Sequence, residues 1–180
     1  MARLWGGEAS WVHEAQRGSV PDLEALFRQH WPRAHRAAFL VVQDAAAAED
    51  IAQEAFLAAV RALDRFDRRR PFGPWLHRIV VNRAIDWARA RRLRAEVGGD
   101  ALEDWAALAD EPANPYSEPV AQALASLPPE HRAVIVLRHL LEYTPGEIAE
   151  LLDLPRGTVN SRLRRGLDRL RDQLPEDGDD

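Results

Sequence analysis

The amino-acid sequence predicts an all-α protein made of two small helical domains joined by a flexible acidic linker. Ala, Leu, Arg and Glu dominate the 180 residues, and this mixture favours helices. Apolar residues recur at helical spacing, and no segment shows the alternation of apolar and polar residues that a half-buried strand requires. Hydrophobic residues make up 46% of the chain, which is enough for a packed core.

The first domain is expected over residues 1–94. A helix is predicted over 20–30, and Pro32 is expected to interrupt it because proline lacks the N–H that a helix interior needs. A second helix should then run from Pro32 to Val42. Two tryptophans, Trp5 and Trp11, precede these helices, and either the first domain or a partner is open as their packing site.

Asp44 is the candidate N-cap of the next helix, which is predicted over residues 45–66. Its expected inner face consists of Ile51, Ala55, Leu57 or Ala58, and Leu63. Polar residues recur at i, i+4 spacing on another face of this helix, and they are Glu49, Asp50, Gln53 and Glu54.

A loop with turn residues, DRRRPFGP, follows, and Pro74 suits the first turn of the last helix of this domain. That helix is expected to end near Arg94. Its large apolar residues are Trp75, Ile79, Ile85 and Trp87, and the two tryptophans are expected to pack in the core.

The second domain is expected over residues 117–174 and begins with a helix capped by Ser117. An apolar helix opens with the prolines at 128 and 129. Thr144, Pro145 and Glu147 then form a helix start signal, with Thr as N-cap and Glu completing a capping box. The segment 153–155 ends that helix, and a second helix is predicted from Gly157 to Leu174.

Two helices meeting at a short turn, with arginines on the second, have the pattern of a helix-turn-helix. Its corner should be buried by Ile148, Ala149, Leu152, Leu154, Val159 and Leu163. The remaining side chains at the start of the second helix suit phosphate oxygens and base edges. They are Arg156, Thr158, Asn160, Ser161, Arg164 and Arg165. An αα-hairpin with a solvated basic side is the alternative interpretation.

The net charge of −5 hides a segregation of charge along the chain. Residues 61–94 contain eleven arginines and three aspartates, a net charge of +8, and residues 156–171 contain six arginines and one aspartate, a net charge of +5. Between them, residues 95–120 contain seven acids and no base. Such a shift indicates a linker, expected over 95–116, and an acidic tail follows at 175–180. A further hypothesis is that this linker shields the first basic block.

Composition excludes several classes of site. The chain has no Cys, which removes disulfides, thiolate catalysis and Cys-bound zinc. His77, His131 and His139 lack partners at ligand spacing, so neither a metal nor another cofactor is expected. No apolar run is long enough to span a membrane, and the first residues lack a signal peptide, so the expected location is the cytoplasm.

Three segments in this order resemble the extracytoplasmic-function group of RNA polymerase sigma factors. AEDIAQEAFLAAVRALDRFD resembles the helix that binds core polymerase, and PFGPWLHRIVVNRAIDWARARR resembles the helix that recognises and melts the −10 element. LASLPPEHRAVIVLRHLLEYTPGEIAELLDLPRGTVNSRLRRGLDRL resembles the domain that binds the −35 element. The resemblance extends from about Leu23 to Leu174.

The resemblance implies a promoter-specificity subunit that has no catalytic residues, is monomeric when free and is held inactive by an anti-sigma factor. Glu49, Asp50, Gln53 and Glu54 would face the basic coiled coil of the polymerase's largest subunit, and the polymerase flap is a further contact. Single-stranded DNA needs arginines for phosphates and polar or apolar groups for bases. A base clasp is expected from Phe66, Asp67, Arg68, Arg69, Arg70 and Phe72. Asn82 would read a base, and phosphates would be held by Arg78, Arg83, Arg89, Arg91 and Arg92.

The sequence departs from the family pattern at two positions. Asn160 stands where relatives often have a basic residue, and because Asn prefers adenine edges, the −35 sequence that is read is expected to differ. Asp153 replaces the usual glycine of the turn, and Asp tolerates the left-handed conformation well. An ordinary helix-turn-helix regulator is the alternative function. A helical enzyme is the third, although the sequence offers no nucleophile–base pair, metal cluster or phosphate loop.

Overall fold

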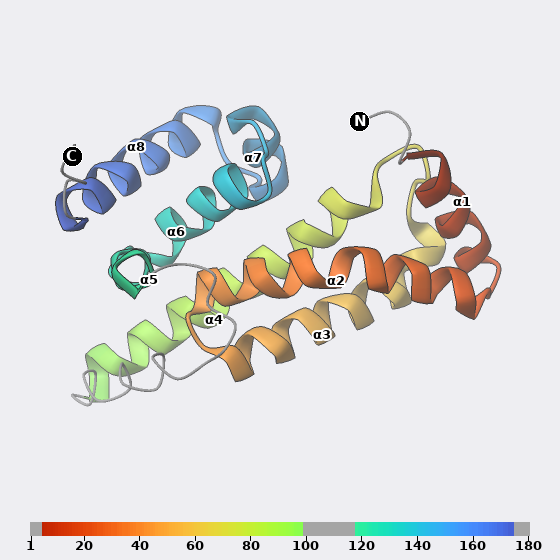
Figure 1. The fold of residues 1–180 in the computed structure, drawn as a ribbon, viewed down its shortest axis with the longest axis horizontal. Coiled ribbons are helices and arrows are strands. Elements are labelled where there is room, and N and C mark those ends of the chain that lie inside the picture. Colours follow the sequence, from red (N-terminus) through yellow and green to blue (C-terminus); the bar gives the residue numbers. More distant parts are fainter. Residues whose placement is uncertain (1–4, 99–117, 175–180) are drawn as a thin grey trace, which may run out of the picture.

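The structure is a computed structural model that describes residues 5–98 and 118–174, and every regular element in these ranges is helical (Figure 1). The all-α prediction is therefore confirmed. The elements are α1 (Trp5–Gln16), α2 (Val20–Val42), α3 (Ala45–Ala62), the 3-10 turn η1 (Leu63–Arg65), α4 (Phe72–Gly98), α5 (Glu118–Ala125), α6 (Pro129–Ile135), the π-helical turn η3 (Val136–Leu140), α7 (Pro145–Leu152) and α8 (Arg156–Gln173).

The first four helices form one layered group in which α2 lies against both α3 and α4 (Figure 1). Small alanines allow these helices to approach closely, and branched side chains fill the space between them. Leu26, Val41, Leu76 and Val80 are almost fully inaccessible to solvent. Because complete burial of such a side chain stabilises by about 1.5–3 kcal/mol, this layer fixes the positions of the helix faces that point outward.

The predicted break at Pro32 is wrong, since α2 runs without interruption from Val20 to Val42. Proline removes the hydrogen bond to the carbonyl of Arg28, four residues earlier. Both Arg28 and Pro32 lie on the exposed side of α2, where water can solvate that carbonyl. The opposite side, including Leu26 and Ala34, is fully buried and keeps the two halves of the helix in line.

Asp44 caps α3 as predicted, because its side chain accepts a hydrogen bond from the Ala47 N–H at 2.9 Å. The inner face expected for α3 is right at Ile51, Ala55 and Leu63. Of the two alternatives given for the position between them, Leu57 is wrong because it is 54% exposed, and Ala58 is half-buried. Phe56 takes the inward position instead. Leu57 lies on the side of α3 that carries the exposed Gln53, whereas Phe56 lies on the side that carries the buried Ala52.

The helix α4 has Pro74 in its first turn, as predicted, and extends four residues beyond the expected end at Arg94. Trp75 and Trp87 are partly buried against the core, as predicted. Trp11 of α1 also packs against this core, so its packing site lies within the chain and not on a partner.

The second group of helices contains the predicted corner. Thr144 and Glu147 form the predicted capping box at the start of α7, and Asp153 ends α7 with φ 54° and ψ 51°, the left-handed conformation expected of it. α8 then begins at Arg156 and packs against α6 and α7. The predicted apolar corner is present: Ile148, Val159 and Leu163 are buried, and the three others are partly buried against them.

The two groups pack on each other through one continuous core, with α6 against α2 and α4, and α7 against α4 (Figure 1). The buried Arg132 of α6 donates a hydrogen bond to the Val41 carbonyl at the end of α2, with an N–O distance of 2.7 Å. Burial lowers the pKa of this guanidinium to about 10, so it remains charged at neutral pH. The remaining sequence predictions for this part of the chain, Ser117 as a cap, the linker beyond residue 98 and the acidic tail, lie outside the described residues.

Candidate nucleic-acid interface

The exposed start of α8 presents the side chains predicted to read duplex DNA. Arg156, Asn160, Arg164 and Arg165 are exposed, while Thr158 and Ser161 are half-buried. The Ser161 hydroxyl donates to the Thr158 carbonyl at 2.9 Å, so in this structure its proton is used inside the helix. The face therefore offers three guanidinium groups and one amide, which suit phosphates, guanine edges and adenine edges.

The corner that presents α8 is fixed by local hydrogen bonds. The Glu147 carboxylate accepts from the Thr144 N–H and from its hydroxyl, both at 2.7 Å. These bonds lower the pKa of Glu147 below its usual value. At the other end of α7, the Leu154 N–H donates to the Ala149 carbonyl at 2.9 Å. The hydrogen bonds at both ends of α7 therefore hold α8 rigidly in its exposed position.

The loop between η1 and α4 is the second candidate DNA contact, and its two phenylalanines are not exposed. Phe66 and Phe72 are 9% and 3% exposed, and both rings pack on Trp75, with centroids 4.5 and 5.6 Å away. Their rings are therefore not free to stack on a base in this structure. They fix the two ends of the loop in the core, and the residues between them remain exposed.

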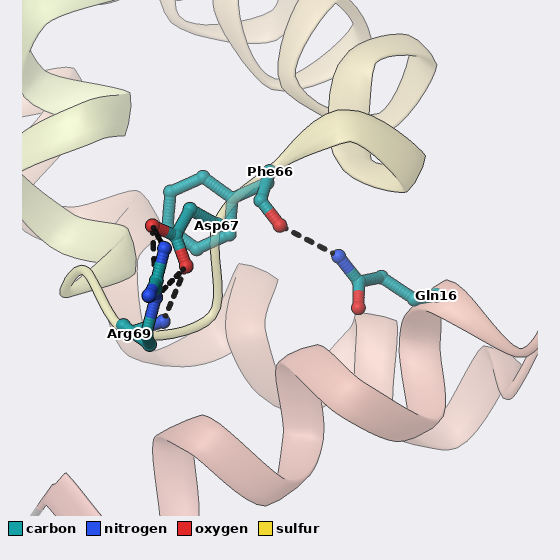
Figure 2. Close-up of polar contacts among 4 residues, drawn as sticks. All are labelled: Gln16, Phe66, Asp67 and Arg69. Carbon is teal, nitrogen blue, oxygen red and sulfur yellow. Dashed lines mark hydrogen bonds and ion pairs between the residues drawn. The ribbon is translucent and has the colours of Figure 1, made fainter.

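Asp67 organises the exposed part of this loop (Figure 2). Its carboxylate accepts from the backbone N–H of Arg69 at 3.0 Å and from the Arg69 guanidinium at 3.0 and 3.1 Å. These bonds lower the pKa of Asp67. Arg68 and Arg70 are also exposed, so the loop presents a cluster of cations around one carboxylate.

The outer face of α4 is partly covered by other elements. Arg78 is exposed and Asn82 is half-buried. Arg83 forms an ion pair with Glu54 of α3 at 3.0 Å, and Arg89 forms an ion pair with Glu130 of α6. Partial burial alone would raise the pKa of Glu130. The hydrogen bonds and the charge of Arg89 outweigh burial and lower this pKa. Of the two further predicted phosphate contacts, Arg91 pairs with Asp44 at 2.7 Å, and Arg92 also has an interaction partner.

A cavity of about 620 Å³ lies between this loop and the second helical group. The loop side of the cavity is basic and includes Arg65, Arg70 and Arg78, and the α7 side is acidic and includes Glu147 and Glu150. Opposite charges thus face each other across the space in front of the candidate single-strand contact.

The predicted acidic face of α3 is present, since Glu49, Asp50, Gln53 and Glu54 are all exposed. Gln53 donates to the Glu49 carboxylate at 3.0 Å. Sequence reasoning missed that this face continues into an apolar surface formed by Leu57 and Val60, which are 54% and 39% exposed. Leu57 lies four residues after Gln53, and Val60 lies three residues after Leu57, and this helical spacing is the signal that could have revealed the apolar surface.

A buried polar contact joins the two helical groups beside the cavity. Nδ1 of His77 in α4 lies 2.7 Å from the Tyr143 hydroxyl in a hydrogen bond. Burial lowers the pKa of His77 to about 3 and raises the pKa of Tyr143 above its usual range. Both side chains are therefore neutral at physiological pH. In the described ranges, no cluster of three or more potential metal ligands occurs, and no helix is long and apolar enough to cross a membrane.

Comparison with known proteins agrees with this arrangement. Two family models match in order, Sigma-70 region 2 over residues 26–94 and Sigma-70, region 4 over residues 117–170. The ECF RNA polymerase sigma factor SigW of Bacillus subtilis is 39% identical over 140 residues, which is 71% of this chain and 75% of that protein. The ECF RNA polymerase sigma factor SigE of Mycolicibacterium smegmatis is 34% identical over 177 residues, which is 93% of this chain and 67% of that protein.

Two solved structures have a similar fold. CnrH, in its complex with the cytosolic domain of CnrY, has a TM-score of 0.70 and 27% identity, with 96% of this chain and 99% of that chain covered. The sigma factor RpoE of Bartonella quintana, in its complex with the anti-sigma factor NepR, has a TM-score of 0.71 and 23% identity, with 88% and 100% covered. By its two matched regions and its curated relatives, the chain belongs to the extracytoplasmic-function (ECF) group of RNA polymerase sigma factors.

Proposed function

We propose that this sigma factor directs core RNA polymerase to promoters by reading a −35 element with α8 and a −10 element with α4 and the loop before it. The observation that supports this most strongly is the presence of two separate arginine-bearing surfaces on one chain. One surface is a rigid helix that suits a duplex groove, and the other combines exposed cations with a half-buried Asn82. Duplex reading and single-strand capture need such different surfaces.

Docking on the polymerase is assigned to the exposed face of α3. Its carboxylates would repel DNA and attract a basic protein surface, and the neighbouring Leu57 and Val60 supply apolar area. The −35 contact comprises the exposed residues of α8 described above. The −10 contact comprises Asp67–Arg70, Arg78, Asn82, Arg83 and Arg89, with Phe66 and Phe72 as anchors of the loop.

Promoter binding then requires the two helical groups to separate. The names of the two elements place them about 25 base pairs apart, which is roughly 85 Å at 3.4 Å per base pair. In the structure, α6 and α7 contact α4 directly, and the guanidinium of Arg89 forms an ion pair with Glu130. About 19 residues separate α4 from α5, and a chain of that length reaches at most about 65 Å. The helical groups themselves must therefore span part of the distance.

The chain supplies recognition, and the polymerase supplies the chemistry. The protein is accordingly proposed to act in the cytoplasm, where it has access to the chromosome, as a monomer without a cofactor. Control by an anti-sigma factor is proposed from the family and from the Bartonella quintana complex, whose partner is an anti-sigma factor.

The test is a selection from DNA that is randomised at both elements. Purified chain, with or without core polymerase, is mixed with the library, and the DNA that is bound is recovered and sequenced. Two enriched elements at a fixed spacing, appearing only when chain and core are both present, are expected. Enrichment of a single duplex element by the chain without core would instead identify an ordinary helix-turn-helix regulator.

A further inference from the structure

The helix α1 lies before the residues matched by the Sigma-70 region 2 model, yet it contacts both ends of the loop 66–72. Gln16 Nε2 donates to the Phe66 carbonyl at 3.0 Å, as Figure 2 shows. It also donates to the Leu63 carbonyl at 2.9 Å. Glu8 Oε1 accepts from the Phe72 N–H at 2.9 Å. The backbone at the start and at the end of the loop is therefore hydrogen-bonded to one preceding helix.

The hydrogen bonds to the Phe66 carbonyl and from the Phe72 N–H satisfy groups that the local sequence leaves without a partner, whereas the Leu63 carbonyl also accepts from the Phe66 N–H at 3.0 Å. Carbonyls at a helix C-terminus and N–H groups at a helix N-terminus have no intrahelical partners. Pro71 precedes α4 and has no side-chain acceptor, and the first turn of α4 contains no acid. Glu8 supplies the missing carboxylate from another helix, where the helix dipole favours a negative charge.

The environment of Glu8 keeps this cap charged. Partial burial alone would raise its pKa. The contact with His30, whose Nε2 lies 3.2 Å from Glu8 Oε2, and the N–H groups of Phe72 and Gly73 outweigh burial and lower the pKa. The carboxylate thus remains an acceptor for the start of α4 at neutral pH.

The contacts of α1 reach the exposed part of the loop as well. His13 of α1 contacts the Arg68 guanidinium. Within the loop, Asp67 holds Arg69, and the Arg70 N–H donates to the Asp67 carbonyl at 2.9 Å. The loop is therefore held by α1 at both ends and at one arginine, and it is folded by Asp67 in between.

We propose that α1 is a positioning element for reading of the −10 element, with Gln16 and Glu8 holding the loop in the conformation that meets the unpaired strand. This inference rests on the proposed function of the loop. If the ends of the loop are free to move, its cations and polar groups are no longer aligned. Selective capture of a base depends on that alignment. Gln16 and Glu8 touch protein backbone and not DNA, so their role is positioning.

The experiment separates donation of hydrogen bonds by Gln16 from its packing. Gln16→Met and Gln16→Glu nearly preserve shape but remove both N–H donors, whereas Gln16→Lys restores a donor. Gln173→Met, on α8, is the matched control. Each full-length variant is combined with core polymerase, and opening is measured on templates that carry the best −10 sequence or a single-base change in it. Binding to a −35 duplex and thermal unfolding are measured in parallel.

The expected result is a loss of roughly tenfold in −10 discrimination for Gln16→Met and Gln16→Glu, with recovery in Gln16→Lys and no change in −35 binding. Wild-type discrimination in Gln16→Met overturns the proposal. Equal losses in all three Gln16 variants with a lower unfolding temperature also overturn it, because they indicate a general loss of structure. Failure of the wild-type chain to open any promoter contradicts the proposed function itself and is distinct from both outcomes.

Glu8→Gln provides a second, independent variant. The amide keeps an acceptor oxygen for the Phe72 N–H but loses the charge at the start of α4. An intermediate loss of −10 discrimination, with the fold retained, is expected. If −10 discrimination is unchanged in both Glu8→Gln and Gln16→Met, α1 does not position the loop.

Discussion

Protonation of His77 is predicted to destabilise the packing of α4 against the second helical group. His77 is 5% exposed, and burial lowers its pKa to about 3, while an unfolded histidine has a pKa of about 6.5. Between these two values the unfolded chain binds a proton that the folded chain does not bind. Stability is therefore highest above pH 6.5 and falls as the pH is lowered toward 3. At pH 5 the loss amounts to about 2 kcal/mol.

The assay is urea denaturation of the wild type and of His77→Gln at pH 7.5, 6 and 5, followed by tryptophan fluorescence. Glutamine can still form a hydrogen bond with the Tyr143 hydroxyl but does not titrate, so the difference between the two proteins isolates His77 from other groups. The stability advantage of the wild type is expected to fall by about 2 kcal/mol between pH 7.5 and 5. A difference that stays constant over this range would refute a buried, neutral His77.

Three further predictions follow from the proposed contacts. Arg164→Ala should cost roughly 1–3 kcal/mol at one −35 base, and unchanged promoter selectivity in run-off transcription would show that this face is assigned wrongly. Thr144→Ala removes the capping box of α7 and should lower the free energy of unfolding by about 1 kcal/mol in urea denaturation, whereas an unchanged value would contradict a stabilising cap. Glu130→Gln removes the ion pair with Arg89 and should increase the distance between fluorescent labels attached to Arg28→Cys and Arg171→Cys. The chain has no native cysteine, so only these two positions are labelled. Equal energy transfer before and after this change would show that the pair does not hold the two groups together.

The sequence predicted most of the local structure, because the signals involved are themselves local. The cap at Asp44, the capping box at Thr144 and the left-handed Asp153 each depend on a few neighbouring residues, and each was confirmed. The break at Pro32 was wrong because burial on the other side of the helix, a tertiary effect, outweighed the loss of one hydrogen bond. Leu57 was one of two candidates for the inner face of α3, because apolar character alone does not distinguish a core position from an exposed one.

The relations between distant segments were beyond sequence reasoning. Nothing in the local pattern shows that Gln16 reaches Phe66, that Glu8 caps α4 or that Arg132 bonds to Val41. Phe66 and Phe72 were expected at the DNA because of their place in a basic loop, whereas packing on Trp75 draws both rings into the core. Such pairings depend on how the helices assemble, and no periodicity within a single helix encodes them.

The central claim is that this chain supplies promoter recognition to core polymerase, and one run-off transcription experiment tests it most directly. Core polymerase and a template from the selection are incubated with the wild-type chain, with Asn82→Ala or with no chain. A transcript of defined length with the wild type, a reduced amount with Asn82→Ala and none without the chain are predicted. Transcription that is equal with and without the chain would contradict the claim.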